Sequence, residues 1–309
     1  MARFLVLAVL MSGGCSSGRL SESDAGVLAP PDDGTVDPIG SNASLDVGAW
    51  NLKNFPCGNA SDSSTCRTGS DGTPALDASL MQALAPDLLS VEEIDSEDAF
   101  NQVVSLWPGR TGILSTHTYF DGSYQKVGFI YDSAVLVADN SALLFEDDDS
   151  FPRPPLEVHF TWTGAGAPLH FVAIVVHLKA GEEAADIARR GASFVTLEQH
   201  LEDLARNDDE NVIVMGDFNE TLTSTSGLEN FAPFLGNAAY DVRTAEIAEN
   251  GAVSFLPSGV ELDHIITTAP FASAIGARQA EIPPLDHDVS DYLGRVSDHL
   301  PVFLSIASP

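Results

Sequence analysis

Short apolar runs recur along the chain from residue 45 onward, separated by polar or turn-forming residues. Eight of these runs have the length of β-strands and cover residues 45–50, 87–91, 127–131, 156–162, 170–176, 212–215, 264–267 and 302–306. Apolar residues at steps of three and four predict a long helix over 182–206, and shorter helices are expected over 75–85 and 97–106. Strand-length runs with helices between some of them favour one mixed sheet, or two packed sheets, covered by helices.

The first 14 residues have the organisation of an export signal. Arg3 supplies the basic start, residues 4–11 form a short apolar stretch, and small residues precede Cys15. The segment resembles a bacterial lipoprotein signal, which implies lipid on Cys15 and a membrane anchor, although Ser12 stands where Leu is usual. Secretion without lipid and a buried helix are the alternatives. We therefore expect an exported protein, either an outer-membrane or cell-surface lipoprotein or a secreted one.

The rest of the chain divides into a tether and one domain. Residues 15–43 are rich in Ser, Gly, Pro and Asp and carry no periodic apolar face, which predicts a flexible tether. Residues 44–309 contain all the expected strands and helices. The chain has 309 residues, of which 44% are hydrophobic. These values exclude a disulfide-stapled miniprotein and a disordered chain.

Two cysteines lie in a polar segment directly after the first expected strand. Cys57 and Cys66 enclose a stretch of Gly, Asn, Asp, Ser and Thr, for which a loop is the expected conformation. In an oxidising compartment the pair should form a local disulfide. A zinc site is the weaker alternative, because no other Cys or His stands nearby to complete four ligands.

The charge balance is strongly acidic. The formal net charge of -31 argues against tight electrostatic binding of nucleic acid or anionic lipid over a broad face. Any anionic substrate must therefore be met locally. The acidic runs 147–149 and 208–210 are most simply solvated loops, and a structural Ca²⁺ site there is the alternative.

One motif joins a strand to groups that carry chemistry. The apolar run 212–215 is followed by Gly216, Asp217, Phe218 and Asn219. Asp217 and Asn219 are two residues apart, so in extended geometry their side chains project to the same side. Strand ends are common places for active sites, although a single motif of this kind also suits a loop cap.

Six further motifs accompany it in order. The complete set is 50–55, 86–94, 124–128, 176–181, 216–219, 262–265 and 297–302. The set resembles the endonuclease/exonuclease/phosphatase superfamily, which includes deoxyribonucleases of the pancreatic type. The resemblance covers about residues 45–306. It implies an α/β fold in which two packed mixed β-sheets are flanked by helices, a four-layer α/β sandwich.

The resemblance also implies a divalent-metal site. Asn51 and Glu93 are expected to hold the ion, and Asp298 would complete the metal or water network. Carboxylate and amide oxygens are hard ligands that suit Mg²⁺, or Mn²⁺ in its place. The expected cofactor is therefore a divalent cation that leaves room for phosphate oxygens and water.

Five residues take the remaining roles in the family's chemistry. Asp217 and Asn219 would position or activate the attacking water. His177 and His299 would contact the phosphate. Asp263 would orient His299, because a carboxylate can fix the tautomer of a histidine. Which group is the general base, Asp217 or the pair of Asp263 and His299, stays open.

A few residues are candidates for binding the substrate phosphate. Tyr124 aligns with a phosphate-contacting tyrosine of abasic-site endonucleases, with a structural role as the alternative. The chain has only three lysines, and each lies in one of the motif segments. The cations nearest to the motifs are Lys53, Lys126, Lys179, Arg189 and Arg190. Of these, Lys53, Lys179 and Arg189 are the expected phosphate contacts.

Three positions depart from the family pattern. Glu92 stands where Gln is usual, which would place an extra negative charge beside the metal. Asp95 stands where nucleases often have a basic residue. Both changes weaken a nucleic-acid assignment more than they weaken hydrolysis. His264 replaces a common Tyr and should be tolerated in a strand.

These observations predict a metal-dependent phosphodiester hydrolase, most simply an exported nuclease that cuts DNA or RNA by in-line attack of water. The alternative enzyme is a phospholipid or sugar-phosphate phosphodiesterase or phosphatase, favoured by membrane anchoring and by the scarcity of Lys and Arg. A catalytically silent binding module is a third possibility. Such a module should lack Asn51, Glu93, Asp217 or His299, and all four are present. No obligate protein partner is expected.

Overall fold

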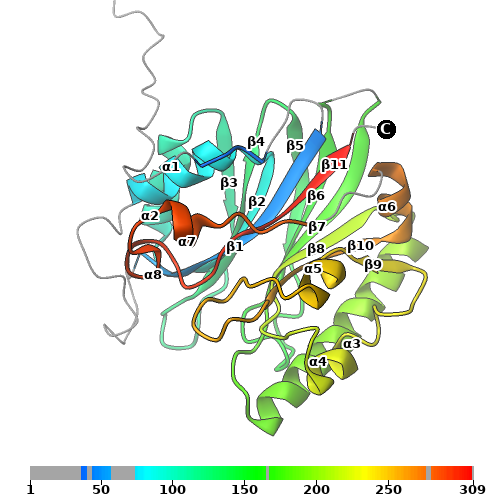
Figure 1. Ribbon diagram of the computed structural model, residues 1–309. Coiled ribbons are helices and arrows are strands. Elements are labelled where there is room, and N and C mark those ends of the chain that lie inside the picture. The colour runs from blue at the N-terminus through cyan, green and yellow to red at the C-terminus, as the bar shows by residue number, and fades with distance from the viewer. Residues whose placement is uncertain (1–35, 40–43, 57–73, 165–166, 276–279, 308–309) are drawn as a thin grey trace, which may run out of the picture.

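The fold is seen in a computed structural model of the chain (Figure 1). The structure describes residues 36–39, 44–56, 74–164, 167–275 and 280–307. The expected signal segment, Cys15 and the pair Cys57 and Cys66 lie outside the described residues, so lipidation and the disulfide stay predictions. Within the described ranges, no helix has both the length and the apolar character needed to cross a membrane.

The first sheet combines the N-terminal strands with the last strand of the chain. Its strand order is β11 (Val302–Ala307), β1 (Ser44–Phe55), β2 (Leu88–Ile94), β4 (Lys126–Asp132) and β3 (Arg110–Leu114). Strands β1 and β2 are parallel, and all other neighbours are antiparallel. The sheet is therefore mixed.

The second sheet is built from the middle of the chain. Its strand order is β5 (Leu136–Leu143), β6 (Leu156–Trp162), β7 (Leu169–His177), β8 (Val212–Asp217), β10 (Asp263–Thr268) and β9 (Tyr240–Val242). Here β7 and β8 are the parallel pair. The other pairings are antiparallel, so this sheet is also mixed.

The two sheets pack face to face with helices on both outer sides. The inner faces form one buried apolar cluster, in which Val47 and Ala49 of the first sheet join Ala173 and Val175 of the second. Successive residues of a strand point to opposite faces, so Trp50 belongs to a different cluster, on the outer face. Helices, the first sheet, the second sheet and further helices thus form a four-layer α/β sandwich, which confirms the fold class expected from the resemblance (Figure 1).

The helices cover the two outer faces. Helices α1 (Pro74–Leu84) and α2 (Glu97–Leu106) pack on the first sheet, and α3 (Ala184–Arg206) with α4 (Thr225–Asn230) packs on the second. Shorter helices occupy connections: α5 (Ala245–Glu249), α6 (Ala269–Ile275), α7 (Leu285–Asp288) and α8 (Tyr292–Arg295). The three helices expected from the sequence are present, and α2 has the predicted bounds.

Sequence patterns missed three strands. The mostly exposed β5 lies at an edge of the second sheet, where pairing requires little buried apolar surface. Strand β3 is half-buried throughout and shows no alternation. Strand β9 has only three residues. In each case the backbone ladder with a neighbouring strand determines the conformation, and the apolar pattern does not.

A short piece of the expected tether packs on the domain. Val36 and Ile39 contact the cluster beneath α1, and the Ile39 amide donates a hydrogen bond to the Leu84 carbonyl at 3.0 Å. The packed chain therefore begins at least as early as Val36. These residues lie within the range assigned to the tether.

Candidate active site

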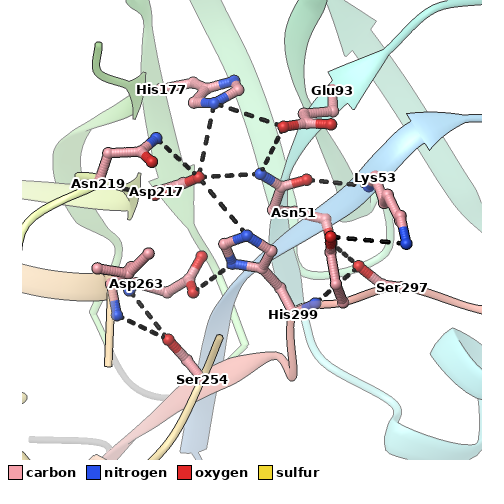
Figure 2. Close-up of polar contacts among 12 residues, drawn as sticks. Asn51, Lys53, Glu93, His177, Asp217, Asn219, Ser254, Asp263, Ser297 and His299 are labelled. Carbon is pink, nitrogen blue, oxygen red and sulfur yellow. Dashed lines mark hydrogen bonds and ion pairs between the residues drawn. The ribbon is translucent and has the colours of Figure 1, made fainter. Parts of the chain in front are cut away.

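The topology brings distant motifs to one edge of the sandwich. The parallel pairs β1 with β2 and β7 with β8 place Asn51, Glu93, His177 and Asp217 near strand ends. Strand β10 runs antiparallel to β8 and pairs Asp263 with Asp217, so the start of β10 meets the end of β8. Figure 2 shows these side chains converging from both sheets.

Asp217 lies at the centre of the contacts. The Asn51 amide donates to Asp217 Oδ2 at 2.9 Å and to Glu93 Oε1 at 3.2 Å. The amide nitrogen of Asn219 donates to Asp217 Oδ1 at 2.7 Å, and its side-chain amide donates to Oδ2 at 3.1 Å. The structure thus brings Asn51, Glu93, Asp217 and Asn219 together as the resemblance implied.

His299 and Asp263 form a buried pair beside Asp217. Nδ1 of His299 is 2.8 Å from Asp263 Oδ2, and Nε2 is 3.9 Å from Asp217 Oδ2. Burial alone would lower the pKa of His299, but Asp263 and Asp217 outweigh it and raise this pKa to about 10. Burial raises the pKa of Asp217 to about 7, against the lowering effect of charged His299. Asp263 therefore orients His299 and holds it as a cation.

His177 differs from His299 in both charge and partners. Its Nε2 lies 3.5 Å from Asp217 Oδ2 and 3.7 Å from Glu93 Oε1. Burial, followed by the charges of Arg153 and His299, lowers the pKa of His177 well below its usual value. The ring is therefore neutral. Two histidines with opposite charge states therefore face the Asp217 carboxylate (Figure 2).

Arg153 belongs to the site and was missed by sequence reasoning. Its Nη2 is 2.8 Å from His177 Nε2, and its Nε donates to Gln125 Oε1 at 3.0 Å. Because an arginine can only donate, His177 accepts through Nε2 and carries its proton on Nδ1. The available signal was a lone Arg in the proline-rich loop before β6, in a chain with few cations.

Left-handed backbone turns two functional side chains into the site. Glu93 has φ 59° and Asn219 has φ 51°, a region that residues other than Gly seldom adopt. The β1 and β2 pairing shifts register between Asn51 and Phe55, and the β2 and β4 pairing shifts between Val91 and Ile94. These irregularities interrupt strict alternation at the catalytic ends of the strands.

Gly216 is required by close packing of the two parallel strands. Its φ is 136°, and a Cβ at this position would lie 2.1 Å from the carbonyl oxygen of Val176. No larger residue fits without displacing β7 from β8. Gly216 therefore sets the approach that places His177 opposite Asp217.

Glu92 corrects one expectation. Its side chain is fully buried and accepts a hydrogen bond from Ser90 Oγ at 2.9 Å. Burial, and then the Asp263 carboxylate, raise the pKa of Glu92 well above its usual value. The extra carboxyl is therefore enclosed, and burial disfavours the negative charge that was expected beside the metal ligands.

The residues expected to hold a metal fit a hard divalent cation. Glu93 and Asp298 keep 18% and 21% of their side chains exposed, so their carboxylate oxygens can be reached from solvent. The amide oxygen of Asn51, which accepts a hydrogen bond from the Lys53 backbone amide at 2.9 Å, is a further hard oxygen donor. Asp298 lies at the edge of the group, with Oδ2 3.6 Å from Lys53 Nζ. Such oxygen donors match the preferences of Mg²⁺ and Mn²⁺.

A second group of possible metal ligands lies deeper. Among the described residues, Asp217, Asp263 and His299 have ligand atoms within 4.8 Å of one another. All three are buried, and His299 Nδ1 is already committed to Asp263. A protonated imidazole has no lone pair free for a metal, so the charge on His299 suits acid-base chemistry in this group.

Most of the expected phosphate contacts already have partners. Lys53 Nζ faces Asp298, Lys179 Nζ lies 3.0 Å from Asp186 Oδ1, and Arg189 Nε donates to the carbonyl oxygen of Asp149. The two other cations near the motifs have structural partners. Arg190 is buried against Glu220, and Lys126 is buried against Glu97.

Tyr124 faces the start of α2 and has no contact with the catalytic group among those the structure records. Its hydroxyl accepts from the Glu97 amide at 3.2 Å, and Lys126 Nζ lies 4.8 Å from its ring centroid. These contacts favour the structural alternative. Tyr119, which the sequence did not single out, is nearer to the site's charges. Burial raises its pKa, and Arg153 and Asp95 also affect it.

Asp95 is buried beside the metal group. Burial, and then the Glu93 carboxylate, raise the pKa of Asp95 to about 7, while Arg153 opposes the rise. A carboxyl therefore occupies the place where nucleases often carry a basic residue. His264 is also buried and bonds with Thr244 Oγ1 and the Glu220 carbonyl, so it is structural, as expected.

Comparisons with known proteins agree with this site. The profile of the Endonuclease/Exonuclease/phosphatase family matches residues 48–299. The human Nocturnin catalytic domain is similar in structure, with a TM-score of 0.62 and 19% identity over 86% of this chain and 93% of that chain. No curated protein sequence matches the chain.

Two further solved structures share the fold. A complex of TDP2 from D. rerio with a single-strand DNA product gives a TM-score of 0.63 with 13% identity, over 86% of this chain and all of that one. A mannosyl-6-phosphatase from Bacteroides thetaiotaomicron gives 0.61 with 16% identity, over 85% and 100%. At such identities these structures support the fold alone. Together with the family match, which spans most of the domain, they place the chain in the endonuclease/exonuclease/phosphatase family of divalent-metal-dependent phosphoesterases.

Proposed function

We propose that the protein is an exported, Mg²⁺- or Mn²⁺-dependent phosphodiester hydrolase in which water attacks phosphorus in line. The observation that carries the proposal is the unbroken set of contacts from Glu93 through Asn51 and Asp217 to the pair of His299 and Asp263. These contacts place the solvent-accessible carboxylate of Glu93 beside the buried acid-base group. A phosphate between them would meet both.

Each side chain has a role that follows from its contacts. Asp217 is positioned by Asn51 and Asn219 and takes the proton of the attacking water. His299, held as a cation by Asp263, donates hydrogen bonds to the charge that develops on phosphate oxygens. As the new bond between water oxygen and phosphorus forms, the bond to the leaving oxygen breaks, and that oxygen takes a proton from cationic His299, which is restored by the proton held on Asp217.

A divalent cation held by Glu93, Asn51 and Asp298 would neutralise charge on a phosphate oxygen. The chain's own contribution beside this group is Arg153 with His177. Arg153 is only partly buried and also donates to the Leu178 carbonyl at 3.4 Å, so its guanidinium is fixed at the wall of the site. It offers a positive charge where the other near-site cations are paired.

The charges around the site favour a substrate with one phosphate group over a long polyanion. Asp95 is buried beside Glu93, and Lys53 and Lys179 each face a carboxylate. A phospholipid or sugar-phosphate ester needs only the local contacts described above. A nucleic acid would need further cations along its backbone. DNA or RNA cleavage is therefore the second candidate, motivated by the family and by the resemblance to nucleases.

One assay panel tests the proposal. Plasmid DNA, RNA, sphingomyelin and bis(p-nitrophenyl) phosphate would each be incubated with the full chain in Mg²⁺ or in EDTA, and with Asp217→Asn as the matched inactive variant. We expect hydrolysis that requires Mg²⁺ and is lost in Asp217→Asn. Turnover that survives chelation, or no turnover of any phosphoester, would overturn the proposal.

Salt dependence separates the two substrate classes. For a single phosphate, moderate salt should leave activity unchanged or raise it slightly, because the chain carries a net charge of -31. A steep fall of nuclease activity with salt, of the size that indicates roughly six or more phosphate contacts, would instead establish the polyanion as the substrate.

A further inference from the structure

Phe120 differs from every other apolar side chain on the described surface. Its exposed fraction is 109%, whereas the other exposed large hydrophobic residues lie between 46% and 51%. A ring that is fully in water adds nothing to the stability of the fold. Single exposed apolar residues are common, so exposure alone assigns no role. The placement of Phe120 supplies the further argument.

The turn that carries Phe120 is held by several hydrogen bonds. The Tyr119 amide donates to the Ser123 carbonyl at 2.8 Å, and the Gly122 amide donates to the Tyr119 carbonyl at 2.9 Å. Asp121 Oδ1 accepts from both the amide and the hydroxyl of Ser123, at 3.0 and 2.6 Å. The ring is thus presented from a defined turn between β3 and β4.

The same loop forms part of the active-site wall. After the turn, Gln125 donates to Asn54 Oδ1 and accepts from Arg153 Nε, both at 3.0 Å. Asn54 in turn donates its amide to Glu93 Oε2 at 2.8 Å, and Arg153 contacts His177. The loop is therefore tied to both the metal side and the histidine side of the site.

Tyr119, the residue before Phe120, also links this turn to the site. Tyr119 is half-buried and close enough to Arg153, Asp95 and Glu93 for their charges to affect its pKa. Its ring packs edge-on against His117, with centroids 5.3 Å apart. Phe120 is therefore a fully exposed ring on the loop that is tied to the active-site wall, next to a residue that lies near the site's charged groups.

We propose that Phe120 is a specificity residue that contacts an apolar or aromatic group attached to the substrate phosphate. This inference rests on the proposed function and deepens it, since it gives the substrate a nonpolar body. An aromatic side chain can cover an acyl chain or stack on a nucleobase. Either source gives the same chemistry at Phe120, and the acidic surroundings supply no attraction for additional phosphates.

The test compares wild-type protein with Phe120→Ala on three substrates in Mg²⁺. Methyl p-nitrophenyl phosphate has a small body, a short-chain phosphatidylcholine below its micelle concentration has acyl chains, and a dinucleoside monophosphate has bases. We expect Phe120→Ala to lower kcat/KM about tenfold, through KM, on at least one large substrate. The small substrate should change less than twofold. Leu228→Ala, which removes an exposed apolar residue on α4, is the control and should change none of them.

Two conservative variants identify the source of the apolar group. Phe120→Leu should restore activity on the phosphatidylcholine if an acyl chain is bound, whereas Phe120→Trp should restore it on the dinucleotide if a base stacks. An equal effect of Phe120→Ala on all three substrates, or no effect on any, would refute the role of Phe120 while leaving the hydrolase intact. No turnover by the wild-type protein would refute both proposals.

Discussion

Nδ1 of His299 lies 2.8 Å from Oδ2 of Asp263, and both side chains are buried beside Asp217. The carboxylate fixes which nitrogen of the ring faces Asp217 and stabilises the protonated form. We expect Asp217→Asn and His299→Ala each to reduce turnover by roughly 10² or more, the usual scale for acid-base and transition-state contacts. Steady-state kcat on a chromogenic phosphodiester measures the effect.

The matched controls are exposed residues that make none of the recorded contacts of the site. His287 is 79% exposed, and Asp208 is exposed in the loop after α3. His287→Ala and Asp208→Asn should keep wild-type turnover. If His299→Ala or Asp217→Asn retained a near-normal rate, the assignment of that residue would be wrong.

Removal of one anionic metal ligand should weaken metal binding. We expect Glu93→Gln to raise the Mg²⁺ concentration needed for half-maximal activity, because a neutral amide oxygen binds a hard cation less strongly than a carboxylate. Activity titrated with Mg²⁺ gives this concentration. Glu146→Gln, at an exposed position, should leave it unchanged. An unshifted midpoint in Glu93→Gln would remove Glu93 from the metal site.

Arg153 should matter more than the cations that sequence reasoning selected. Arg153→Ala leaves Nε2 of His177 without its donor and removes a charge from the wall of the site. We expect kcat/KM to fall by roughly tenfold or more, consistent with loss of a charge-assisted contact. Arg189→Ala removes a half-buried side chain that contacts Asp149 and should have little effect. Equal effects of the two substitutions would argue against this ranking.

Glu261 should make the fold less stable at high pH. Burial, with a smaller contribution from Asp263, raises the pKa of Glu261 from 4.5 to about 9. The unfolded chain releases this proton near 4.5, whereas the folded chain keeps it until about 9. The stabilising contribution of this group is therefore complete below 4.5 and declines as pH rises from 4.5 to 9.

Glu261→Gln should remove this part of the decline. The free energy of unfolding, measured in denaturant at several pH values, should fall less between pH 5 and 9 in Glu261→Gln than in the wild type. Glu249→Gln, at an exposed position of α5, is the control and should follow the wild type. Parallel curves for Glu261→Gln and wild type would contradict the prediction.

The cysteine pair gives a prediction for a segment outside the described residues. Cys57 and Cys66 should appear as one bridged peptide in a nonreducing digest of exported protein. A double substitution to Ser should lower the free energy of unfolding by about 2 to 3 kcal/mol by the chain-entropy estimate for a loop of this length. Two alkylatable thiols in the exported protein would refute the bridge.

Most of the site could be predicted from the sequence because its residues follow apolar runs that mark the ends of strands. Asp217 and His177 each follow a run of buried apolar residues, and the parallel pairing of β7 with β8 sets them opposite each other. Pattern alone left open whether there was one sheet or two. The ordered set of motifs supplied that answer, since the resemblance specified two packed sheets.

The remaining features depend on contacts that no local pattern encodes. Arg153 comes from an irregular loop, and only the folded chain brings it to His177. The buried state of Glu92 depends on the irregularity that turns Glu93 into the site, which shifts the alternation that a strand would otherwise follow. Lys126 and Arg190 look like exposed cations in the sequence, but each has a carboxylate partner far away in the chain.

Because the site is divided between two sheets, catalytic activity depends on how the sheets pack against each other. Asn51 and Glu93 belong to one sheet, whereas Asp217 and Asp263 belong to the other. Contacts such as that of Phe129 with Phe160, whose ring centroids are 5.9 Å apart, join the sheets through the shared core. If the sheets shifted against each other by about one ångström, the acid-base group would move away from the metal ligands, although every catalytic residue would be unchanged. Substitutions in this core are therefore limited by the geometry that catalysis requires as well as by the stability of the fold.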